Sequence, residues 1–600
     1  MLVVTKKVCK NNKNVGLWSL VFGLLVNPQL PIPNFFVSLP SQNLNDMSTV
    51  PIFCITLNKT LEVPYGAPLQ ELIKTHHIQL ETDILGALVN NKVRDLTYKI
   101  HKPAIIDFFD YSSTYGHDMY VRSLYFLLCK AVDDVLPRSV KLHIKHSISG
   151  GRYCTITNID EPITEELVSK IYQQMRKLVD QNLPFERVGM LTPDAIKLFQ
   201  DHGLEDKYEL FKDRDRIFTS VYKLGDIVNY YYGFMVPSTG YLKIFGLEKY
   251  ESGMLLKVPS SKNINVLPKT RQLPKLFSVY QRQKEWAEQM GVPYVFDMNR
   301  LVAENKALDT ILMAEAFQEK RIASVADAIK NRPEVKMVLI SGPSSSGKTT
   351  TCKRLSVQLG VLGYHPVQIS VDDFFVERDE TPKDKNGNYD FEALEAVDLP
   401  LFNKTLSDLI AGKLVELPTF DFSNGTKLWT GKSIQLDEKS IMVIEGIHCL
   451  NPKLTEQVPD DVKFKIFVSA LTSISIDRQN PIPTTDNRLI RRIVRDYNYR
   501  GYSAVETLRR WRSVRNGEEK NIFPFQENAD EMINTSLIFE LGVLKPYASA
   551  ILRQVPETCV EYAEATRLLK FLSFFKTIPE HTIPGISILR EFVGGSKFNY

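Results

Sequence analysis

The stretch Gly342-Pro343-Ser344-Ser345-Ser346-Gly347-Lys348-Thr349 decides the fold of the C-terminal half of this chain. It follows the apolar run 338–340 and precedes a segment with helical periodicity at 350–359. A strand, a glycine-rich loop and then a helix form the context that a phosphate-binding loop requires. The glycines let backbone N–H groups turn inward around a phosphate, and the helix N-terminus adds its positive dipole end. The sequence therefore predicts a phosphate site at this loop.

Two side chains of the loop have predicted roles of their own. Lys348 is expected to reach the β- and γ-phosphates of ATP, and the Thr349 hydroxyl is expected to ligate Mg²⁺. The alternative is a turn of small residues without a ligand, and the flanking strand and helix argue against it. We predict ATP contacts along the whole loop and at the next residue: Gly342, Pro343, Ser344, Ser345, Ser346, Gly347, Lys348, Thr349 and Thr350.

The length and composition indicate a multidomain globular protein. At 600 residues the chain is too long for one core and predicts about three or four domains. It is 44% hydrophobic and 24% charged, and its net charge of +4 gives no warrant for a strongly basic nucleic-acid binder. The seven cysteines are scattered without a CxxC pair, which is typical of a reducing compartment, so we expect a cytoplasmic protein.

Residues 1–46 have the composition of an extension rather than of a domain. Four lysines precede the apolar run 15–26, as in the n- and h-regions of a secretory signal, but no small-x-small cleavage site follows. The run is also too short to span a bilayer comfortably. We predict an extension that is disordered or processed, with a signal or transit peptide as the alternative, and we predict no transmembrane segment elsewhere.

The rest of the chain changes pattern several times. Residues 47–110 combine a hairpin pattern around Asn58-Lys59 with a helical stretch and further strands, which suggests a β-grasp module. Residues 111–300 mix amphipathic helices with alternating strands, an α+β pattern, and the run Tyr230-Tyr231-Tyr232 is predicted to be strand core. Residues 301–335 predict one long connecting helix.

Beyond residue 336 the pattern predicts a doubly covered parallel sheet. Short β-branched runs at 337–340, 367–371, 440–444 and 465–468 alternate with helical segments. Such alternation is typical of a parallel sheet with helices on both faces. We assign this domain to residues 336–550 and a C-terminal helical segment to residues 551–600.

Acidic residues follow two of these expected strands, at the edge where open parallel sheets bind ligands. Asp372 is the candidate general base for an acceptor hydroxyl and could also hold the water shell of the metal. Glu445 ends an apolar run in the Walker B position, and its carboxylate would complete the Mg²⁺ site begun by Thr349. The alternative for both acids is a cap or turn after a buried strand, which is the better interpretation for Asp373.

A basic segment follows at 487–501. Its spacing places Arg488, Arg492 and Arg495 near one helical face. Guanidinium groups suit a phosphoryl transition state, and such a segment can close as a lid over the phosphates. The alternative is a solvated basic face, which we favour less because a P-loop and a Walker B pattern precede it.

Six motifs now carry a family resemblance. GPSSSGKTT, SVDDFF, FEALEAVDLPLF, ELPTFDF, VIEGIH and RLIRRIVRDYNYRG occur in an order and spacing similar to those of the uridine kinase and phosphoribulokinase group of P-loop kinases, over residues 338–547. The resemblance implies that Asp372 is the catalytic base. It implies further that Glu392, with Asp390 as its competitor, binds ribose hydroxyls. Arg492 and Arg495 match the arginines that contact ribose and phosphates, and Arg500 matches the arginine before the lid glycine.

The chain departs from the family at the base-binding end. Phe420 stands at the tyrosine of the family's YDF motif, and Phe375 also replaces a tyrosine. The histidine that reads the pyrimidine has no counterpart, since Ser423-Asn424-Gly425 occupies its place. Phosphoryl transfer is therefore better supported than uridine or cytidine specificity, because a site without those polar groups cannot discriminate in the same way.

The N-terminal half resembles another family. Residues 51–108 look like a TGS domain, and residues 115–245 look like the editing-type second domain of threonyl-tRNA synthetases, by pattern and order more than by identity. In that editing domain two ligand pairs form a metal-binding or hydrolytic site. Here Arg122 and Phe126 stand at the first pair, and Tyr231 and Met235 stand at the second. We therefore predict neither metal nor editing there.

These inferences lead to one expected architecture and function. We expect a multidomain α/β and α+β protein: a TGS-like β-grasp module, a synthetase-like α+β region and a P-loop kinase domain. The expected function is transfer of the ATP γ-phosphate, with Mg²⁺, to the 5′-hydroxyl of a nucleoside. Three residues would be catalytic: Asp372, Lys348 and Arg495. Three others would bind the substrate: Glu392, Phe420 and Arg492. The alternatives are a phosphoribulokinase-like sugar kinase, for which Lys427 would bind a second phosphate, and a nucleotide-switched protein that binds RNA through its TGS-like region. Homo-oligomerisation stays open, and we expect no membrane partner.

Overall fold

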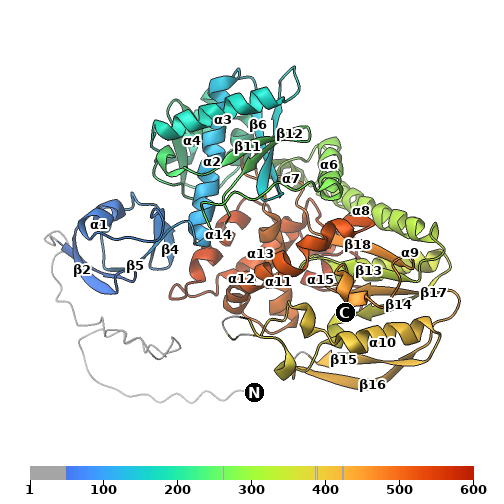
Figure 1. The fold of residues 1–600 in the computed structure, drawn as a ribbon. Coiled ribbons are helices and arrows are strands. Elements are labelled where there is room, and N and C mark those ends of the chain that lie inside the picture. Colours follow the sequence, from blue (N-terminus) through green and yellow to red (C-terminus); the bar gives the residue numbers. More distant parts are fainter. Residues whose placement is uncertain (1–48, 261–262, 385–386, 388, 422–423, 600) are drawn as a thin grey trace, which may run out of the picture. The chain divides into compact units, whose positions relative to one another are not determined.

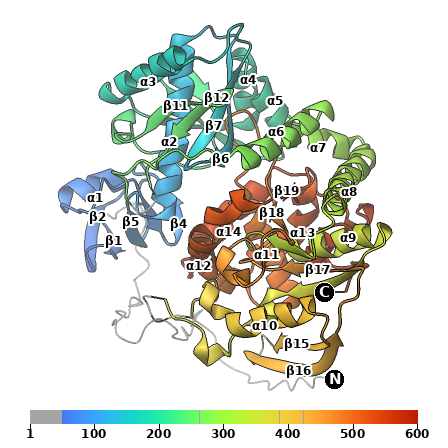
Figure 2. The same cartoon turned by 45° about the vertical axis from the view of Figure 1, so that its right-hand side comes forward.

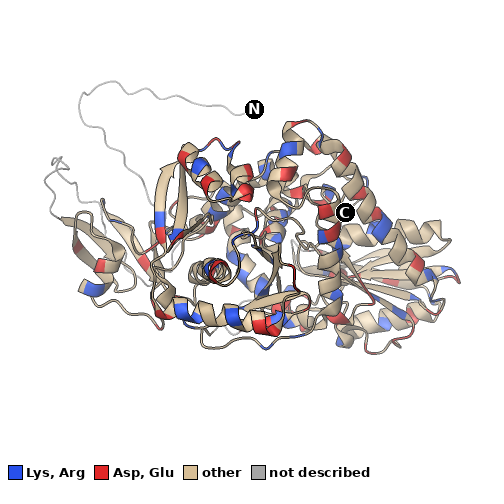
Figure 3. Cartoon of the chain, turned by 90° about the horizontal axis from the view of Figure 1, so that it is seen from above, with Lys and Arg blue, Asp and Glu red and all other residues tan. Residues whose placement is uncertain are grey.

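The computed structural model describes residues 49–260, 263–384, 387, 389–421 and 424–599. The predicted extension at 1–46 and Ser423 lie outside these residues. Within the described part of the chain, no helix is long and apolar enough to cross a membrane. Figure 3 shows Lys and Arg interspersed with Asp and Glu along the same elements, in keeping with the small net charge of +4.

The first module is a five-stranded sheet with one helix. The predicted hairpin is confirmed, because β1 (Thr49–Cys54) pairs antiparallel with β2 (Lys59–Pro64) across a turn in which Asn58 has a φ of 51°. Asn90 and Asn91 both have positive φ, as tight hairpin turns require, and join β3 to β4. The sheet order is β2-β1-β5-β3-β4, and the remaining elements are α1 (Leu69–Thr75), β3 (Gly86–Val89), β4 (Lys92–Arg94) and β5 (Ala104–Phe109).

The α+β region holds two antiparallel sheets, with strand orders β11-β12-β7-β6 and β10-β9-β8. The tyrosine run is buried as predicted, but it does not form a strand. Strand β10 ends at Asn229, and the three tyrosines follow it in an irregular segment with their side chains buried. The elements are α2 (Thr114–Val135), β6 (Lys141–Ile148), β7 (Gly151–Thr157), α3 (Glu165–Asp180), β8 (Glu186–Leu191), α4 (Thr192–Asp201), α5 (Glu205–Phe211), β9 (Phe218–Leu224), β10 (Ile227–Asn229), β11 (Gly246–Tyr250), β12 (Gly253–Lys257) and α6 (Pro274–Gln289).

Most of the connecting segment forms one long helix as predicted, α8 (Ala307–Lys330), but its first residues belong to a separate helix, α7 (Val295–Ala303). Asn305 between them has a φ of 56°, the left-handed conformation that ends a helix and that asparagine adopts readily. Apolar residues continue at helical spacing across the break, which is why the sequence pattern did not reveal it.

The predicted parallel sheet is confirmed. Its strand order is β14-β17-β13-β18-β19, and every pairing is parallel. Alternate residues of the central strand face opposite sides: Val338 and Ile340 pack with α8 and α9, while Met337 and Leu339 pack with α10 (Figure 1). The strands are β13 (Met337–Ser341), β14 (His365–Ser370), β17 (Ser440–Glu445), β18 (Lys463–Ser469) and β19 (Glu531–Asn534), and the covering helices include α9 (Lys348–Val361) and α10 (Leu399–Ile410).

Two parts of this region were absent from the sequence prediction: strand β19 and a hairpin of β15 (Val415–Asp421) with β16 (Thr426–Ile434). The C-terminal helices are α11 (Thr484–Tyr499), α12 (Ala504–Asn521), α13 (Glu540–Leu552), α14 (Tyr562–Leu572) and α15 (Arg590–Val593). Short 3-10 turns are η1 (Thr239–Tyr241), η2 (Val371–Phe374), η3 (Arg378–Glu380), η4 (Leu394–Ala396), η5 (Pro452–Thr455), η6 (Phe523–Asn528) and η7 (Glu580–Thr582).

One hydrophobic core joins residues from both halves of the chain. It combines α4, α5 and α7 with helices α11, α13 and α14. Strand β4 also lies beside the C-terminal helices (Figure 2), since its Lys92 Nζ donates to Glu557 Oε1, between α13 and α14, at 3.1 Å. The α+β region therefore packs directly on the helices that follow the parallel sheet.

A buried lysine contributes to this junction. Lys207 on α5 is fully buried, forms an ion pair with Asp477, and donates to Gln479 Oε1 at 2.8 Å. Gln479 in turn donates to the Leu142 carbonyl at 2.9 Å. The loop between β18 and α11 is thus bound by groups of the α+β region.

Replacing this lysine should destabilise the protein. In Lys207→Met the Asp477 carboxylate stays buried without its cation, which typically costs about 3–5 kcal/mol. A denaturant titration followed by tryptophan fluorescence should show the loss. Lys212→Met, which removes a partly exposed pair with Glu209, is the matched control and should cost about 0–1 kcal/mol. Equal shifts in the two variants would contradict a stabilising role for the buried pair.

Candidate phosphate-transfer site

The loop between β13 and α9 has the backbone of a phosphate cradle. Ser345 and Gly347 have positive φ of 58° and 84°. A Cβ on Gly342 would lie 2.0 Å from the Val468 carbonyl oxygen, and one on Gly347 would lie 2.2 Å from Ile588 Cδ1. Both glycines are therefore required by close packing, and Gly347 by its left-handed backbone as well.

The carbonyl groups of this loop are bound from outside. Arg488 Nη1 donates to Ser344 O at 3.1 Å, and Thr535 Oγ1 donates to Ser346 O at 2.6 Å. The C=O and N–H of a trans peptide point in opposite directions. The N–H groups of Ser345 and Gly347 therefore point away from these donors, into the space that a phosphate would fill.

The polar side chains of the loop also fit an anion. The hydroxyl oxygens of Ser345 and Ser346 are buried and have no hydrogen-bond partner among the described residues. Lys348 is half-buried at the start of α9, and it forms no ion pair with any residue that the structure describes. Orphaned buried hydroxyls and an unpaired ammonium at a helix N-terminus suit a nucleotide triphosphate.

The metal-binding residues predicted from the sequence meet at the sheet edge. Glu445 is paired in register with Ser370 on β14 and with Ile340 on β13, directly before the loop. Thr349 Oγ1 donates to Glu445 Oε1 at 3.1 Å. Adjacent oxygen ligands of octahedral Mg²⁺ at about 2.1 Å lie about 3 Å apart, so this pair fits two positions of one magnesium shell.

Charges at the site act on one another. Burial raises the pKa of Glu445, the Lys348 ammonium lowers it, and the Asp372 carboxylate raises it. Asp372 follows β14 in the turn η2, at the same edge of the sheet. The predicted base, the predicted metal ligand and the P-loop lysine therefore lie within electrostatic reach of one another.

The predicted arginines gather around one carboxylate. Asp496 on α11 is bound by Arg492 Nε at 3.1 Å and Arg495 Nη2 at 2.9 Å, with Arg500 Nη1 at 3.8 Å. Arg492 Nη1 also donates to Ser344 Oγ at 2.7 Å, which brings this group to the loop. The charge of Arg495 and then burial lower the pKa of Arg500 to about 10.

Arg488 corrects the sequence interpretation. It does not share the partly buried face of Arg492 and Arg495, because it is 1% exposed and forms a bidentate pair with Glu518. Glu518 also accepts the Ser344 N–H at 3.1 Å. Arg488 and Glu518 are thus supports of the P-loop rather than parts of a lid.

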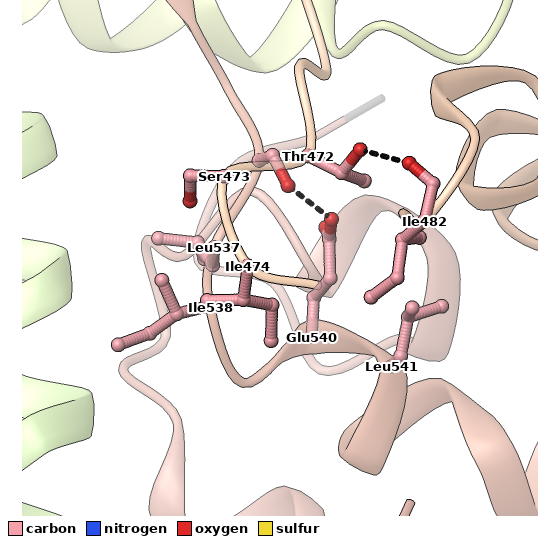
Figure 4. A pocket seen from close by; sticks show the side chains of 9 residues that line it. Thr472, Ser473, Ile474, Ile482, Leu537, Ile538, Glu540 and Leu541 are labelled. Carbon is pink, nitrogen blue, oxygen red and sulfur yellow. Dashed lines mark hydrogen bonds between the residues drawn. The ribbon is translucent and has the colours of Figure 1, made fainter. Parts of the chain in front are cut away.

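Arg491 makes a second support that the sequence did not reveal. It pairs with Glu540, donates to the Thr535 carbonyl at 2.9 Å and approaches Ser345 O at 3.5 Å. Figure 4 shows Glu540 beside a small pocket. Its carboxylate accepts a hydrogen bond from Ser536 Oγ at 2.7 Å. The arginine spacing indicated a helix face, but nothing local indicates acids 30 and 49 residues further on.

One of the two acids predicted to bind the acceptor is influenced by the charges of the phosphate site. Burial raises the pKa of Glu392 to about 7, while the charges of Arg492 and Lys348 lower it. Its backbone N–H donates to Asp390 Oδ1 at 3.2 Å, so the competing acid Asp390 is a local turn residue. Glu392 is the member of this pair that senses the charges of the phosphate site.

Phe375 and Phe420, which we call the aromatic wall, pack against each other. The rings of Phe420 and Phe375 meet edge to face at 5.7 Å. Asp373 Oδ1 accepts the N–H of Phe420 on β15 at 3.3 Å, so it joins η2 to the hairpin instead of capping a local turn. Lys427 Nζ lies 2.7 Å from Asp398 Oδ2, so its charge is compensated within the chain.

The four positions that correspond to an editing-site ligand set carry other contacts. The rings of Phe126 and Tyr231 lie 5.4 Å apart, and Met235 is buried in the same core. Arg122 Nη1 donates to the Phe234 carbonyl at 2.6 Å. Aromatic and aliphatic groups therefore fill this place, and the absence of metal and of editing stays a prediction.

The five-stranded parallel sheet, its P-loop and the acids at its edge define the class: a P-loop kinase fold. Residues 337–537 match the Phosphoribulokinase / Uridine kinase family. The N-terminal region is similar to threonine–tRNA ligases: 34% identical over 191 residues to that of Carboxydothermus hydrogenoformans, covering 32% of this chain and 30% of the ligase. The ligase of Clostridium kluyveri is 32% identical over 187 residues, covering 31% and 29%. The resemblances predicted for both halves are thereby confirmed.

The extent of these matches is limited. The chain spans about three tenths of the length of the ligases that it matches. A solved structure described as a possible uridine kinase from Bacillus stearothermophilus is 21% identical, with a TM-score of 0.25, over 36% of this chain and 98% of that one. A TM-score this low adds nothing to the fold, which rests on the sheet itself.

Loosening the loop support should weaken nucleotide binding. In Glu518→Gln the Arg488 guanidinium loses its charged partner and Ser344 N–H loses a charged acceptor. We expect the Kd for MgATP, measured by isothermal titration, to rise about tenfold or more. Glu519→Gln, on the exposed side of the same helix, should bind as the unmodified protein does. An unchanged Kd in folded Glu518→Gln would contradict the supporting role.

Proposed function

We propose that this protein is an ATP-dependent kinase that phosphorylates a hydroxyl of a nucleoside or a closely similar sugar alcohol. One observation carries the proposal: Thr349 Oγ1 and Glu445 Oε1 lie 3.1 Å apart directly beside a phosphate cradle. The match to the kinase family over residues 337–537 supports it. The P-loop alone indicates phosphate binding, and the acids beside it favour transfer.

The chain's own groups divide the chemistry as follows. The P-loop N–H groups and Lys348 bind the triphosphate, and Thr349 and Glu445 are the residues that would hold Mg²⁺. That ion neutralises phosphate charge in sites of this type. Asp372 takes the proton from the acceptor hydroxyl while the hydroxyl oxygen attacks the γ-phosphorus of ATP and ADP leaves. Arg492, Arg495 and Arg500 stabilise the charge on the phosphoryl group in transfer.

Acceptor binding rests on Glu392 and the aromatic wall. A carboxylate accepts hydrogen bonds from vicinal sugar hydroxyls, and Glu392 lies within the field of Lys348 and Arg492. The edge-to-face pair of Phe420 and Phe375 offers an apolar surface for the rest of the acceptor. This surface favours a broad acceptor range over strict pyrimidine recognition.

The sugar-phosphate alternative has less support. It requires a free cation near the acceptor, whereas Lys427 is compensated by Asp398. A nucleotide-switched, RNA-associated function rests on the N-terminal similarity to threonine–tRNA ligases. The kinase proposal is favoured because its residues meet at one sheet edge.

Transfer from radiolabelled ATP to a panel of nucleosides and pentoses tests the proposal. Asp372→Asn should retain MgATP binding but lose about 10²–10⁴ in kcat, because it removes the general base and not the phosphate cradle. Lys348→Ala should lose both binding and transfer. If the unmodified protein phosphorylates no member of the panel, or if Asp372→Asn transfers at its full rate, the proposal fails.

The pH dependence of acceptor binding tests Glu392. Its pKa is raised to about 7, so the carboxylate form grows as pH increases through that value. If the carboxylate binds the acceptor hydroxyls, the acceptor KM should fall between about pH 6 and pH 8. Glu392→Gln should show a higher KM that is flat across this range. A KM profile that persists in Glu392→Gln would assign the titration to another group.

A further inference from the structure

Five cationic side chains gather where the α+β region meets α14, away from the P-loop. Phe234 joins two of them: its carbonyl accepts from Arg122 at 2.6 Å, and its ring centroid lies 5.0 Å from the Arg187 guanidinium. Ser573 Oγ joins the others: it accepts from Arg214 at 2.9 Å and from Arg216 at 3.4 Å, and it donates to the Lys570 carbonyl at 2.6 Å. We call these residues the cationic cluster: Arg122, Arg187, Arg214, Arg216 and Lys570.

The positive charge of the cationic cluster is poorly compensated. Arg187 has a distant partner, Asp95, at 3.9 Å. In the described part of the chain the other four form no ion pair, although Asp213 and Asp215 are close in sequence. Burial first, and then the charges of all four arginines, lower the pKa of Lys570 to about 7. Such mutual repulsion is relieved when an anion binds.

An exposed strip of sheet adjoins the cationic cluster. Strands β8 and β9 pair Leu191 with Phe218 and Gly189 with Ser220. Arg187 Nη2 donates to Ser220 Oγ at 3.0 Å, which connects the strip to the cations. The Phe218 side chain is 69% exposed and Leu191 is 47% exposed. Nothing lies within 4 Å of a Cβ built on Gly189, so the surface between them is open.

We propose that this face is a second nucleotide-binding site, with the phosphate groups among the cationic cluster and the base on Phe218 and Leu191. Guanidinium forks match phosphate oxygens in geometry and charge. An exposed aromatic ring beside cations favours a base-bearing ligand over a phosphosugar, because every base can stack on it. The site is independent of the P-loop, which lies between β13 and α9 and draws its arginines from α11.

The test uses the full chain carrying Lys348→Ala, so that P-loop binding is suppressed. Equilibrium dialysis with radiolabelled UMP, AMP and ATP, and calorimetry with pyrophosphate, should each show saturable binding. Arg216→Ala combined with Lys570→Met should weaken all of them by about tenfold or more, because charge-assisted contacts are lost. Lys197→Ala, which removes an exposed lysine on α4, should change nothing.

Phe218→Ala separates the two halves of the proposal. It should weaken binding of the mononucleotides severalfold and leave pyrophosphate unchanged. Circular dichroism melts confirm that each variant is folded. Absence of saturable binding, or equal affinities in the double variant, would overturn the proposal. Binding of a single-stranded 12-mer without binding of any mononucleotide would also overturn it, in favour of a nucleic-acid surface. None of these outcomes depends on kinase activity.

Discussion

The constraint on which the site depends is the burial of two arginines beneath the phosphate loop. Arg488 and Arg491 are each 1% exposed or less, and each is paired with a buried glutamate. A buried guanidinium without a partner is strongly unfavourable, so Glu518 and Glu540 have to be in place for α11 to pack. Because the same guanidinium groups bind loop carbonyls, the cradle is shaped by α11, α12 and α13 together.

The two halves of the chain are joined at the start of the same helix. The loop that precedes α11 carries Asp477, which pairs with Lys207 of the α+β region, and Asn480, which donates to the Tyr230 carbonyl at 3.0 Å. Both contacts are buried. These buried polar contacts hold the start of α11 against the α+β region.

The segment beyond the family match also reaches the site. Ile588 packs where a Cβ on Gly347 would lie, and Thr350 Oγ1 donates to Glu591 Oε2 at 2.5 Å. Thr350 is the predicted ATP contact that follows the loop. The match to the kinase family ends at residue 537, so these contacts come from a segment outside the matched region.

The sequence by itself determined the elements whose signals are local. The P-loop follows from glycines at positions that need open backbone, and the parallel sheet follows from β-branched runs that alternate with helices. The sequence placed Asp372 and Glu445 at the same edge of the sheet because the carboxyl ends of parallel strands meet there. The break at Asn305 and the strand β19 were missed because their local patterns resemble those of their neighbours.

Only the tertiary structure decided which charged groups act together. Arg492 has its partner Asp496 four residues further on, but nothing near Arg488 in the sequence indicates that it is buried against Glu518. The cationic cluster likewise draws on α2, β8, the segment before β9 and α14. Local patterns encode secondary structure through periodicity, whereas the partner of a buried charge is set by packing between segments that lie tens to hundreds of residues apart in the chain.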